Sequence, residues 1–228
     1  MSVPALRFRE VDVRLGGEDV LSRVSFDVAK GEIHCIVGPN GGGKTTLIRA
    51  LLGQVPHEGA IEWADSGTVV GYAPQSLDLD RTMPLTVLDV MAIMNQRRPA
   101  FAGRSSRNRA AQDEAIARLG LAGKTRRLFG FLSGGERQRL LFAQALVPNP
   151  GILIMDEPTS NMDDDGARLV EGIVRELAAA GTTVLWVSHD WDQVRRVAAT
   201  ATFINRKVAW SGPPENALPA GPSPKRAA

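Results

Sequence analysis

A glycine-rich run carries the strongest chemical signal in the sequence. Residues 38–45 read Gly-Pro-Asn-Gly-Gly-Gly-Lys-Thr and match the pattern G-x-x-x-x-G-K-[ST]. Glycines let a backbone curve around phosphate oxygens, and the N–H groups at a helix N-terminus bind such anions. The run lies between a predicted strand (33–37) and a predicted helix (44–52), as a phosphate-binding loop requires. The alternative, a glycine-rich turn that binds nothing, fits that context poorly.

We therefore expect a nucleoside triphosphate at this run, which we call the phosphate loop. Lys44 is placed to reach the β- and γ-phosphates, and the Thr45 hydroxyl is placed to hold Mg²⁺. The residues expected to contact the nucleotide here are Gly38, Pro39, Asn40, Gly41, Gly42, Gly43, Lys44, Thr45 and Thr46.

Two adjacent carboxylates end a second predicted strand. Residues 152–155 are apolar, and Asp156 and Glu157 follow them directly. In P-loop NTPases an acidic residue at such a strand end binds Mg²⁺. Glu157 is placed to orient or deprotonate an attacking water. An acidic strand-to-loop junction is the alternative for this pair alone, but the phosphate loop in the same chain favours the catalytic interpretation.

The elements that would position these groups are strands and helices in a mixed order. Strand-like alternation is found at 6–8, 11–13, 24–28 and 33–37, with turn signals at Gly16-Gly17 and Lys30-Gly31. Further short strands are predicted at 59–63, 68–73, 152–155, 183–187, 201–205 and 207–210. Helices are predicted at 44–52, 87–96, 109–119, 136–146, 166–180 and 191–199. The pattern predicts an α/β core interrupted by a mostly helical insertion.

The bulk composition narrows the class of protein. The chain has 228 residues, of which 43% are hydrophobic and 23% charged, as in an ordinary globular protein. A formal net charge of +2 is too mild to indicate nucleic-acid binding. The lone Cys35 excludes an internal disulfide and is expected to be buried in its strand. No stretch has the ~18 apolar residues that a membrane span needs, so a pore would be another polypeptide.

A third motif indicates which kind of nucleotide-hydrolysing protein this chain resembles. Residues 132–138, Leu-Ser-Gly-Gly-Glu-Arg-Gln, open a predicted helix just ahead of the Asp156-Glu157 strand. This segment resembles the signature motif of ABC ATPases. The resemblance covers nearly the whole chain in the family's order: phosphate loop at 38–45, Gln75, signature segment at 132–138, Asp156-Glu157, the loop 160–163, and His189. From the residues alone, the segment also reads as a serine N-cap with Glu136 at N3, and both interpretations can hold together.

The resemblance implies roles for further residues. Gln75 is similar to the glutamine that contacts Mg²⁺ and water, and His189 to the histidine that binds the γ-phosphate. Asp163 matches the aspartate that couples two ATP sites across a dimer, and Leu15 stands where the family usually stacks an aromatic residue on adenine. The residues expected to contact the ATP held by the opposite protomer are Leu132, Ser133, Gly134, Gly135, Glu136 and Gln138. The expected catalytic residues are Glu157, His189, Lys44 and Gln75, with Mg²⁺ held by Thr45, Gln75 and Asp156.

The resemblance also implies a fold class and a domain organisation. The fold class is α/β, a P-loop NTPase core of ABC ATPase type with an N-terminal antiparallel β subdomain and an inserted α-helical subdomain. We expect a single domain over 3–215, with its core at 3–75 and 149–212 and the helical subdomain at about 76–148. The Pro- and Gly-containing stretch 216–228 is expected to be a disordered tail.

The separation of the motifs favours a transporter subunit within this family. Only 89 positions separate Lys44 from Ser133, too few for the long coiled coil of chromosome-maintenance ATPases. The stretches 71–80 and 83–87 are similar to those of zinc and manganese uptake ATPases. Those work at the cytoplasmic face of the inner membrane as homodimers, with an integral-membrane permease and an extracytoplasmic solute-binding protein, and with Mg²⁺ and ATP.

Other functions stay open from the sequence. They are a motor for another small solute and a non-transport regulatory ATPase of the same fold. The histidines His34, His57 and His189 are scattered and form no zinc-ligand spacing, so the transported metal is not expected to bind here. The basic segment at 97–109 is expected to be a solvated loop and helix face, with contact to lipid headgroups or a permease as the alternative.

Overall fold

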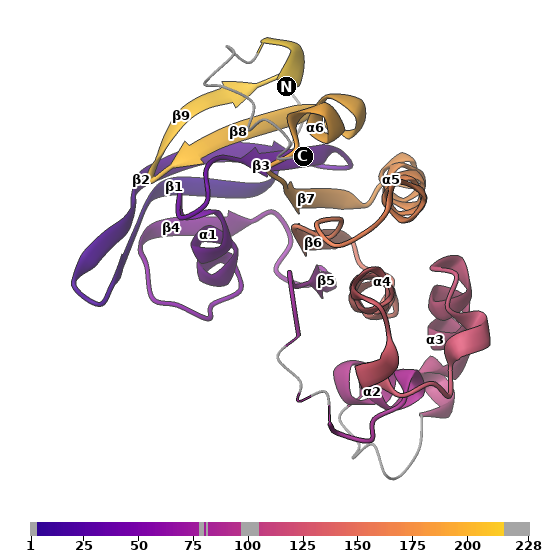
Figure 1. Ribbon diagram of the computed structural model, residues 1–228. Coiled ribbons are helices and arrows are strands. Elements are labelled where there is room, and N and C mark those ends of the chain that lie inside the picture. The colour runs from indigo at the N-terminus through magenta and orange to yellow at the C-terminus, as the bar shows by residue number, and fades with distance from the viewer. Residues whose placement is uncertain (1–3, 78–79, 81, 97–104, 217–228) are drawn as a thin grey trace, which may run out of the picture.

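The computed structural model describes residues 4–77, 80, 82–96 and 105–216. Figure 1 shows two parts, a β-rich body and a group of helices that extends from one side of it. The predicted tail lies, apart from Asn216, outside the described residues, as do Arg97, Arg98 and Arg104 of the basic segment. No helix in the described ranges is long and apolar enough to span a bilayer.

A three-stranded antiparallel sheet forms one layer of the β-rich body. Its strands are β1 (Pro4–Leu15), β2 (Glu18–Ala29) and β4 (Glu58–Trp63), in the order β2-β1-β4. Gly16 and Gly17 connect β1 to β2 with φ of 59° and 87°, the left-handed values that a tight two-residue hairpin turn needs.

The prediction of separate short strands before residue 29 was wrong. Each long strand instead continues through irregular pairing, and Glu10 and Arg23 take positive φ values of 46° and 50°. A β-bulge shifts which side chains face the core without ending the strand, so the alternation breaks while the ladder persists.

The second sheet positions the chemistry. Its order is β5 (Val70–Ala73), β6 (Ile152–Asp156), β7 (Thr183–Val187), β3 (Ile33–Val37), β8 (Thr200–Asn205) and β9 (Lys207–Gly212), parallel except for β9. The carboxyl ends of the parallel strands therefore meet at one edge, which is where open α/β sheets bind ligands. The phosphate loop, Gln75, Glu157 and His189 all follow these ends.

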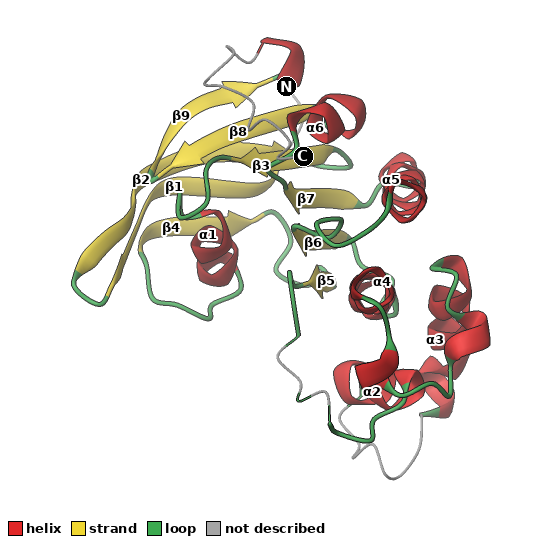
Figure 2. Cartoon of the chain, viewed as in Figure 1, coloured by secondary structure: helices red, strands yellow, loops and turns green. Residues whose placement is uncertain are grey.

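Helices cover both faces of this sheet, as Figure 2 shows. On one face, α1 (Lys44–Leu51) packs between the two sheets, where Phe8, Ile36, Leu47 and Ile154 share a core. The other face is covered by α4 (Gly134–Leu146), α5 (Asp164–Ala179) and α6 (Trp191–Val197). Cys35 is fully buried in that second core, as predicted.

The helical part consists of α2 (Val87–Asn95) and α3 (Ser106–Arg118), packed against α4. Short 3₁₀ turns lie at Ala122–Lys124, Phe129–Phe131 and Pro214–Asn216. The apolar pattern predicted this helix from 136, whereas the predicted capping box, with Ser133 as N-cap and Glu136 at N3, implies a start at 134. The helix begins at Gly134, as the capping box predicted, because the two glycines of the first turn have no apolar side chain that would extend the pattern.

Candidate nucleotide-binding site

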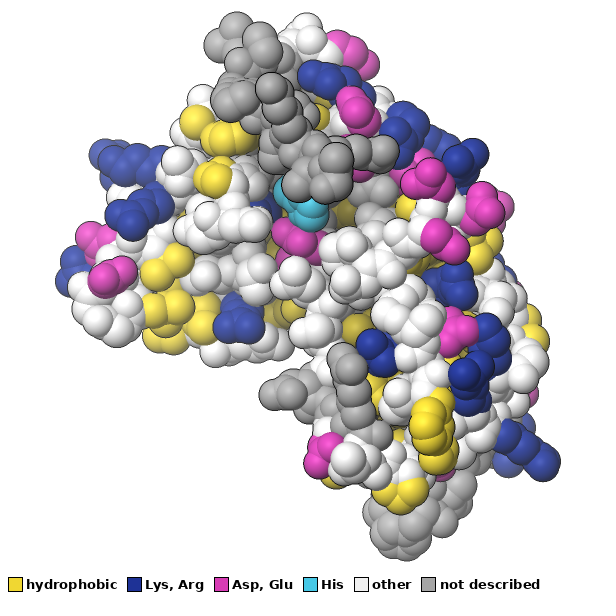
Figure 3. All heavy atoms as spheres, viewed as in Figure 1, with side chains coloured by type: hydrophobic (Ala, Val, Ile, Leu, Met, Phe, Trp, Pro, Cys, Tyr) yellow, Lys and Arg dark blue, Asp and Glu magenta, His cyan; other side chains and the backbone are white. Residues whose placement is uncertain are grey.

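A cleft of about 420 Å³ opens at the carboxyl edge of the parallel strands. It is lined by Val20, Asn40, Gly41, Gly43, Lys44, Thr45, Thr46, Gln75, Glu157 and His189. Most of these residues were predicted from the sequence, and the structure brings them together from β2, the phosphate loop with the start of α1, and the loops after β5, β6 and β7. On the face shown in Figure 3, basic and acidic side chains are interspersed over the β-rich body and the helical part.

The side chain of Lys44 folds back onto the backbone of the phosphate loop. Lys44 Nζ donates to the carbonyl oxygens of Gly38 and Pro39 at 2.9 and 3.0 Å, and the side chain is buried. Burial lowers the pKa of Lys44, while the negative charges of Glu157 and Asp156 oppose that shift. The ammonium group is thus held by two backbone carbonyl oxygens of the loop, which the oxygens of a bound phosphate could replace as acceptors.

The N-terminus of α1 is open toward the cleft. Its cap residue is Gly43, with φ of 97°, and no side chain caps the first turn. The first turn of α1 also contains no acidic residue that would compete for the N–H groups. These N–H groups and the positive end of the helix dipole are therefore free to bind an anion.

Glycine is required at two positions of the loop by close backbone contacts. A β-carbon on Gly38 would lie 2.0 Å from the Ile204 carbonyl oxygen. On Gly42 it would lie 2.9 Å from that oxygen and 3.0 Å from the Pro39 carbonyl oxygen. The backbone of the β8–β9 hairpin thus packs directly against the outside of the phosphate loop and leaves no room for a β-carbon at Gly38 or Gly42.

Asp156 presents a buried carboxylate oxygen with no partner in the described part of the chain. The residue is 1% exposed, and its Oδ1 atom accepts no hydrogen bond there. Burial raises the pKa of Asp156, and a hydrogen bond from Thr45 opposes the shift. A buried carboxylate beside a threonine hydroxyl fits a hard divalent cation, which takes oxygen ligands.

Glu157 is held from two sides. Its Oε2 atom lies 3.2 Å from Gln75 Nε2, which donates to it, and 3.3 Å from His189 Nδ1. The Glu157 backbone is left-handed, with φ of 47°. Such a value is uncommon for a residue with a β-carbon and is often found at functional positions. The three residues come from loops after β6, β5 and β7, so the sheet order alone brings them together.

The signature segment divides into an exposed tip and buried supports. Ser133 is exposed at the N-terminus of α4 and forms the predicted capping box with Glu136. Glu136 also pairs with Lys124, and that contact lowers the pKa of Glu136 most. Leu132, Glu136 and Gln138 are buried within their own chain, so Ser133, Gly134 and Gly135 form the accessible tip.

Two predicted site residues, Asp163 and Leu15, are not among the residues that line the cleft. Asp163 caps α5 by accepting from the Gly166 N–H at 3.0 Å, with Asp164 and Asp165 in the first turn as predicted. Leu15 lies at the end of β1 and is not among the residues that line the cleft, whereas Val20 is. Sequence reasoning missed Val20, whose only signal was its place in the hairpin before the phosphate loop.

A buried polar network also escaped the sequence analysis. Gln193 Oε1 accepts from Thr159 Oγ1 at 3.1 Å and from Ser188 Oγ at 3.3 Å, while Gln193 Nε2 donates to Glu171. It links the segment after Glu157 to the residue before His189. No sequence spacing indicates it, because its members come from separate elements.

His34 lies away from the cleft. It hydrogen-bonds Thr200 and Thr202, and burial lowers its pKa to about 3. Within the described ranges, no group of three or more metal-ligating side chains occurs.

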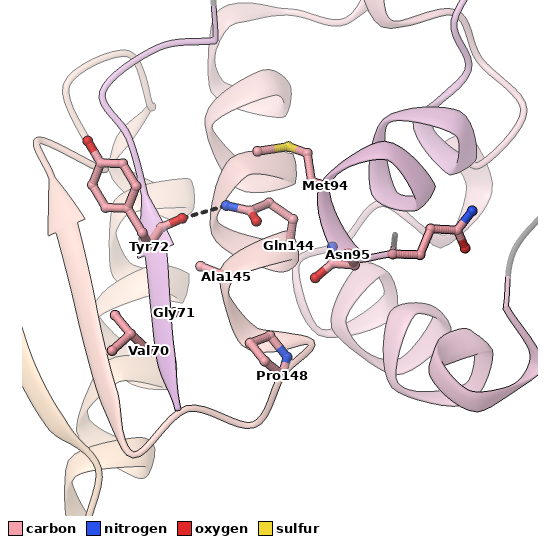
Figure 4. A pocket seen from close by; sticks show the side chains of 9 residues that line it. Val70, Gly71, Tyr72, Met94, Asn95, Gln144, Ala145 and Pro148 are labelled. Atoms are coloured by element: carbon pink, nitrogen blue, oxygen red, sulfur yellow. Dashed lines mark hydrogen bonds between the residues drawn. The ribbon is translucent and has the colours of Figure 1, made fainter. Parts of the chain in front are cut away.

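A second cavity of about 360 Å³ lies between β5, α2 and α4, as Figure 4 shows. Among the described residues, its lining includes Tyr72, Met94, Gln144 and Pro148 but no acidic or basic side chain.

Comparison with known proteins identifies relatives. The family described as ABC transporter matches residues 21–160. The chain is 38% identical to a zinc import ATP-binding protein of Chromohalobacter salexigens over 92% of this chain and 84% of the relative. A protein of the same name from Cereibacter sphaeroides is 37% identical, with 89% and 79% covered.

Solved structures resemble the fold. The cassette of an inward-facing ABC transporter of metal-chelate type superposes with a TM-score of 0.81 at 28% identity, covering 94% of this chain and 85% of that one. An ATP-binding cassette in its ADP conformation gives 0.78 at 23% identity, covering 93% and 92%. The predicted fold class is confirmed.

Proposed function

The chain belongs to the ABC transporter family, in which it is an ATP-hydrolysing subunit, and from that premise we propose that it powers import of a divalent metal, zinc or manganese, through a separate membrane permease. The observation that carries the proposal is the convergence of Gln75, Glu157 and His189 on the cleft beside Lys44. The relatives named as zinc import ATP-binding proteins support the solute class.

The residues of the cleft have distinct tasks in hydrolysis. Lys44 and the N-terminal N–H groups of α1 bind the β- and γ-phosphates, which fixes the leaving group. Glu157 orients the attacking water or accepts a proton from it. This water lies on the side of the γ-phosphate opposite the leaving group. Gln75 and His189 hold the Glu157 carboxylate and donate to oxygens where negative charge develops.

Mg²⁺ is the proposed cofactor. Thr45 and Asp156 would hold it, together with Gln75, and the unpartnered Asp156 Oδ1 supports that assignment. A bound Mg²⁺ ion would neutralise part of the negative charge on the phosphate oxygens. The chain's own contribution is a buried carboxylate whose charge is unfavourable until a cation arrives.

A second copy of the chain completes each site in this proposal. The exposed Ser133 and the Gly134 and Gly135 amides would bind the γ-phosphate held by the opposite protomer. Asp163, at the N-terminus of α5, would couple the two sites. Leu15, an exposed apolar residue at the end of β1, would cover part of the adenine.

The domain division expected from the sequence is part of the proposal. β5 and β6 are adjacent parallel strands, and residues 76–148 leave after one and return before the other. A segment that leaves and re-enters at neighbouring strands is suited to move against its core, here 3–75 and 149–212. We place the subunit at the cytoplasmic face of the inner membrane, with a permease and a solute-binding protein outside.

Uptake measurements test the proposal. Cells lacking this chain should lose high-affinity uptake of labelled zinc or manganese, and wild-type chain but not Glu157→Gln should restore it. Labelled iron and an unrelated amino acid serve as control solutes. Unchanged metal uptake, with the chain absent from membranes that contain the permease, would contradict the assignment and favour another solute or a regulatory role.

A further inference from the structure

Gln138 joins three parts of the site through one side chain. It lies on α4, five residues after Ser133, and is 4% exposed. Its Nε2 atom donates to the Gln75 carbonyl oxygen at 3.2 Å and to the Glu157 carbonyl oxygen at 3.1 Å. An amide nitrogen has two N–H groups, so both donors are used.

We propose that Gln138 is a positioning residue that transmits a movement of α4 to the Gln75 loop and to the backbone of Glu157. The inference rests on the proposed function, because the exposed tip of α4 is there assigned to the opposite nucleotide. The Gln138 side chain then links the helix that binds one ATP to the residue whose carboxylate acts on the other ATP.

Glu157 needs such a support because its backbone is strained. With φ of 47°, it occupies a region of backbone conformation that is unfavourable for a residue with a β-carbon. Three hydrogen bonds hold the residue there: Glu157 N–H to the Val187 carbonyl at 3.0 Å, Ser160 N–H to the Glu157 carbonyl at 3.3 Å, and Gln138. Gln138 is the one side chain among them, so it sets the direction of the Glu157 carbonyl from another element.

The contacts form a closed triangle. Gln138 holds the backbone of Gln75 and of Glu157, and Gln75 Nε2 donates to Glu157 Oε2 at 3.2 Å. Gln75 lies in a loop and is exposed, so the Gln138 bond restrains a residue that little else covers. Displacing α4 would shift both ends of the Gln75–Glu157 contact together.

The same helix provides a matched control. Gln144 lies six residues later on α4, is also buried, and its Nε2 donates to the Tyr72 carbonyl of β5 at 2.6 Å and to the Leu141 carbonyl at 3.0 Å. Figure 4 shows the Gln144–Tyr72 bond. Gln144 therefore ties α4 to β5, the strand just before the Gln75 loop, by the same amide-to-carbonyl chemistry, and its hydrogen bonds within the described ranges do not reach Glu157.

The first test compares Gln138→Met with Gln144→Met in the purified full chain. Methionine keeps the side-chain volume and removes the donors. For Gln138→Met we expect kcat for Mg·ATP to fall by about 10²-fold, the usual effect of misplacing a reacting group by ~1 Å. The Kd of a fluorescent ATP analogue should change less than about threefold. The substitution alters the position of the reacting groups but leaves the residues that bind the phosphates unchanged. Gln144→Met should keep kcat near wild type; equal losses in both variants, or none in Gln138→Met, would overturn the inference.

The second test uses pH, which a packing defect would not follow. In Gln138→Glu the ionised carboxylate has no donor, but the protonated acid donates one O–H group. The ratio of variant to wild-type kcat should therefore rise as the pH falls from about 8 to about 5.5, toward the range in which a buried carboxyl protonates. A ratio independent of pH would overturn the positioning role. This test remains decisive even if the Gln138→Met variant does not fold. Absence of ATP hydrolysis in the wild-type chain would instead refute the proposed function, and with it this inference.

Discussion

The Nδ1 atom of His189 lies 3.3 Å from Oε2 of Glu157. These residues follow two neighbouring parallel strands, β7 and β6, and the contact exists because those strands end at the same edge of the sheet. Gln75 approaches the same oxygen from the loop after β5, the next strand in the order. The carboxylate is thus restrained before any substrate arrives, which reduces the reorganisation that catalysis requires.

Glu157→Gln should separate binding from hydrolysis. The amide oxygen of glutamine can still accept from Gln75, so the loop geometry is kept while the base is lost. We expect kcat to fall by about 10²–10³-fold, with the affinity for ATP unchanged. Single-turnover hydrolysis and equilibrium nucleotide binding measure the two effects, and turnover near the wild-type rate would exclude Glu157 as the base.

His189→Ala removes the second restraint on the carboxylate. We expect kcat to fall by about 10²-fold, as for the loss of one donor to developing charge. His57→Ala is the matched control, since His57 is exposed in the loop before β4 and does not line the cleft. Steady-state ATPase rates of both variants give the comparison; equal rates would place His189 outside the machinery.

Asp156→Asn should stabilise the nucleotide-free protein while abolishing hydrolysis. Burial raises the pKa of Asp156, so its charge costs folding free energy above that pKa and the cost disappears on protonation below it. The increase in Tm over wild type should be largest near neutral pH, at about 2–4 °C per kcal/mol relieved, and shrink as the pH falls toward the ordinary aspartate value. Calorimetry across pH checks this, and a lower Tm for the variant at neutral pH would contradict it.

Gly38→Ala and Gly41→Ala should differ strongly in stability. Both residues have positive φ, of 151° and 76°, but a β-carbon at Gly38 would meet the Ile204 carbonyl oxygen at 2.0 Å, while the space at Gly41 is open. Gly41→Ala should cost about 1–2 kcal/mol of unfolding free energy, the price of a left-handed residue. Gly38→Ala should cost clearly more, because the β8–β9 hairpin must also shift. Urea unfolding measures both, and similar losses would refute the close contact.

Much of the site could be predicted because its motifs are local. The phosphate loop, the Ser133–Glu136 capping box and the acidic pair after β6 each combine a turn or a cap with an adjacent element. Hydrogen bonding and backbone freedom over a few residues determine such units, so their residue types are sufficient. Hydrophobic alternation, which is also local, located the start of most strands of the parallel sheet.

Contacts between distant segments depended on the tertiary structure. Gln75 and Glu157 are 82 positions apart and meet only because β5 and β6 are neighbours in the sheet. The burial of Gln138 against both loops, the contribution of Val20 and the continuous bulged strands β1 and β2 also arise from packing between elements. Sequence determines which groups are present and which local shapes they favour, whereas strand order and core packing decide which of those groups share a cleft.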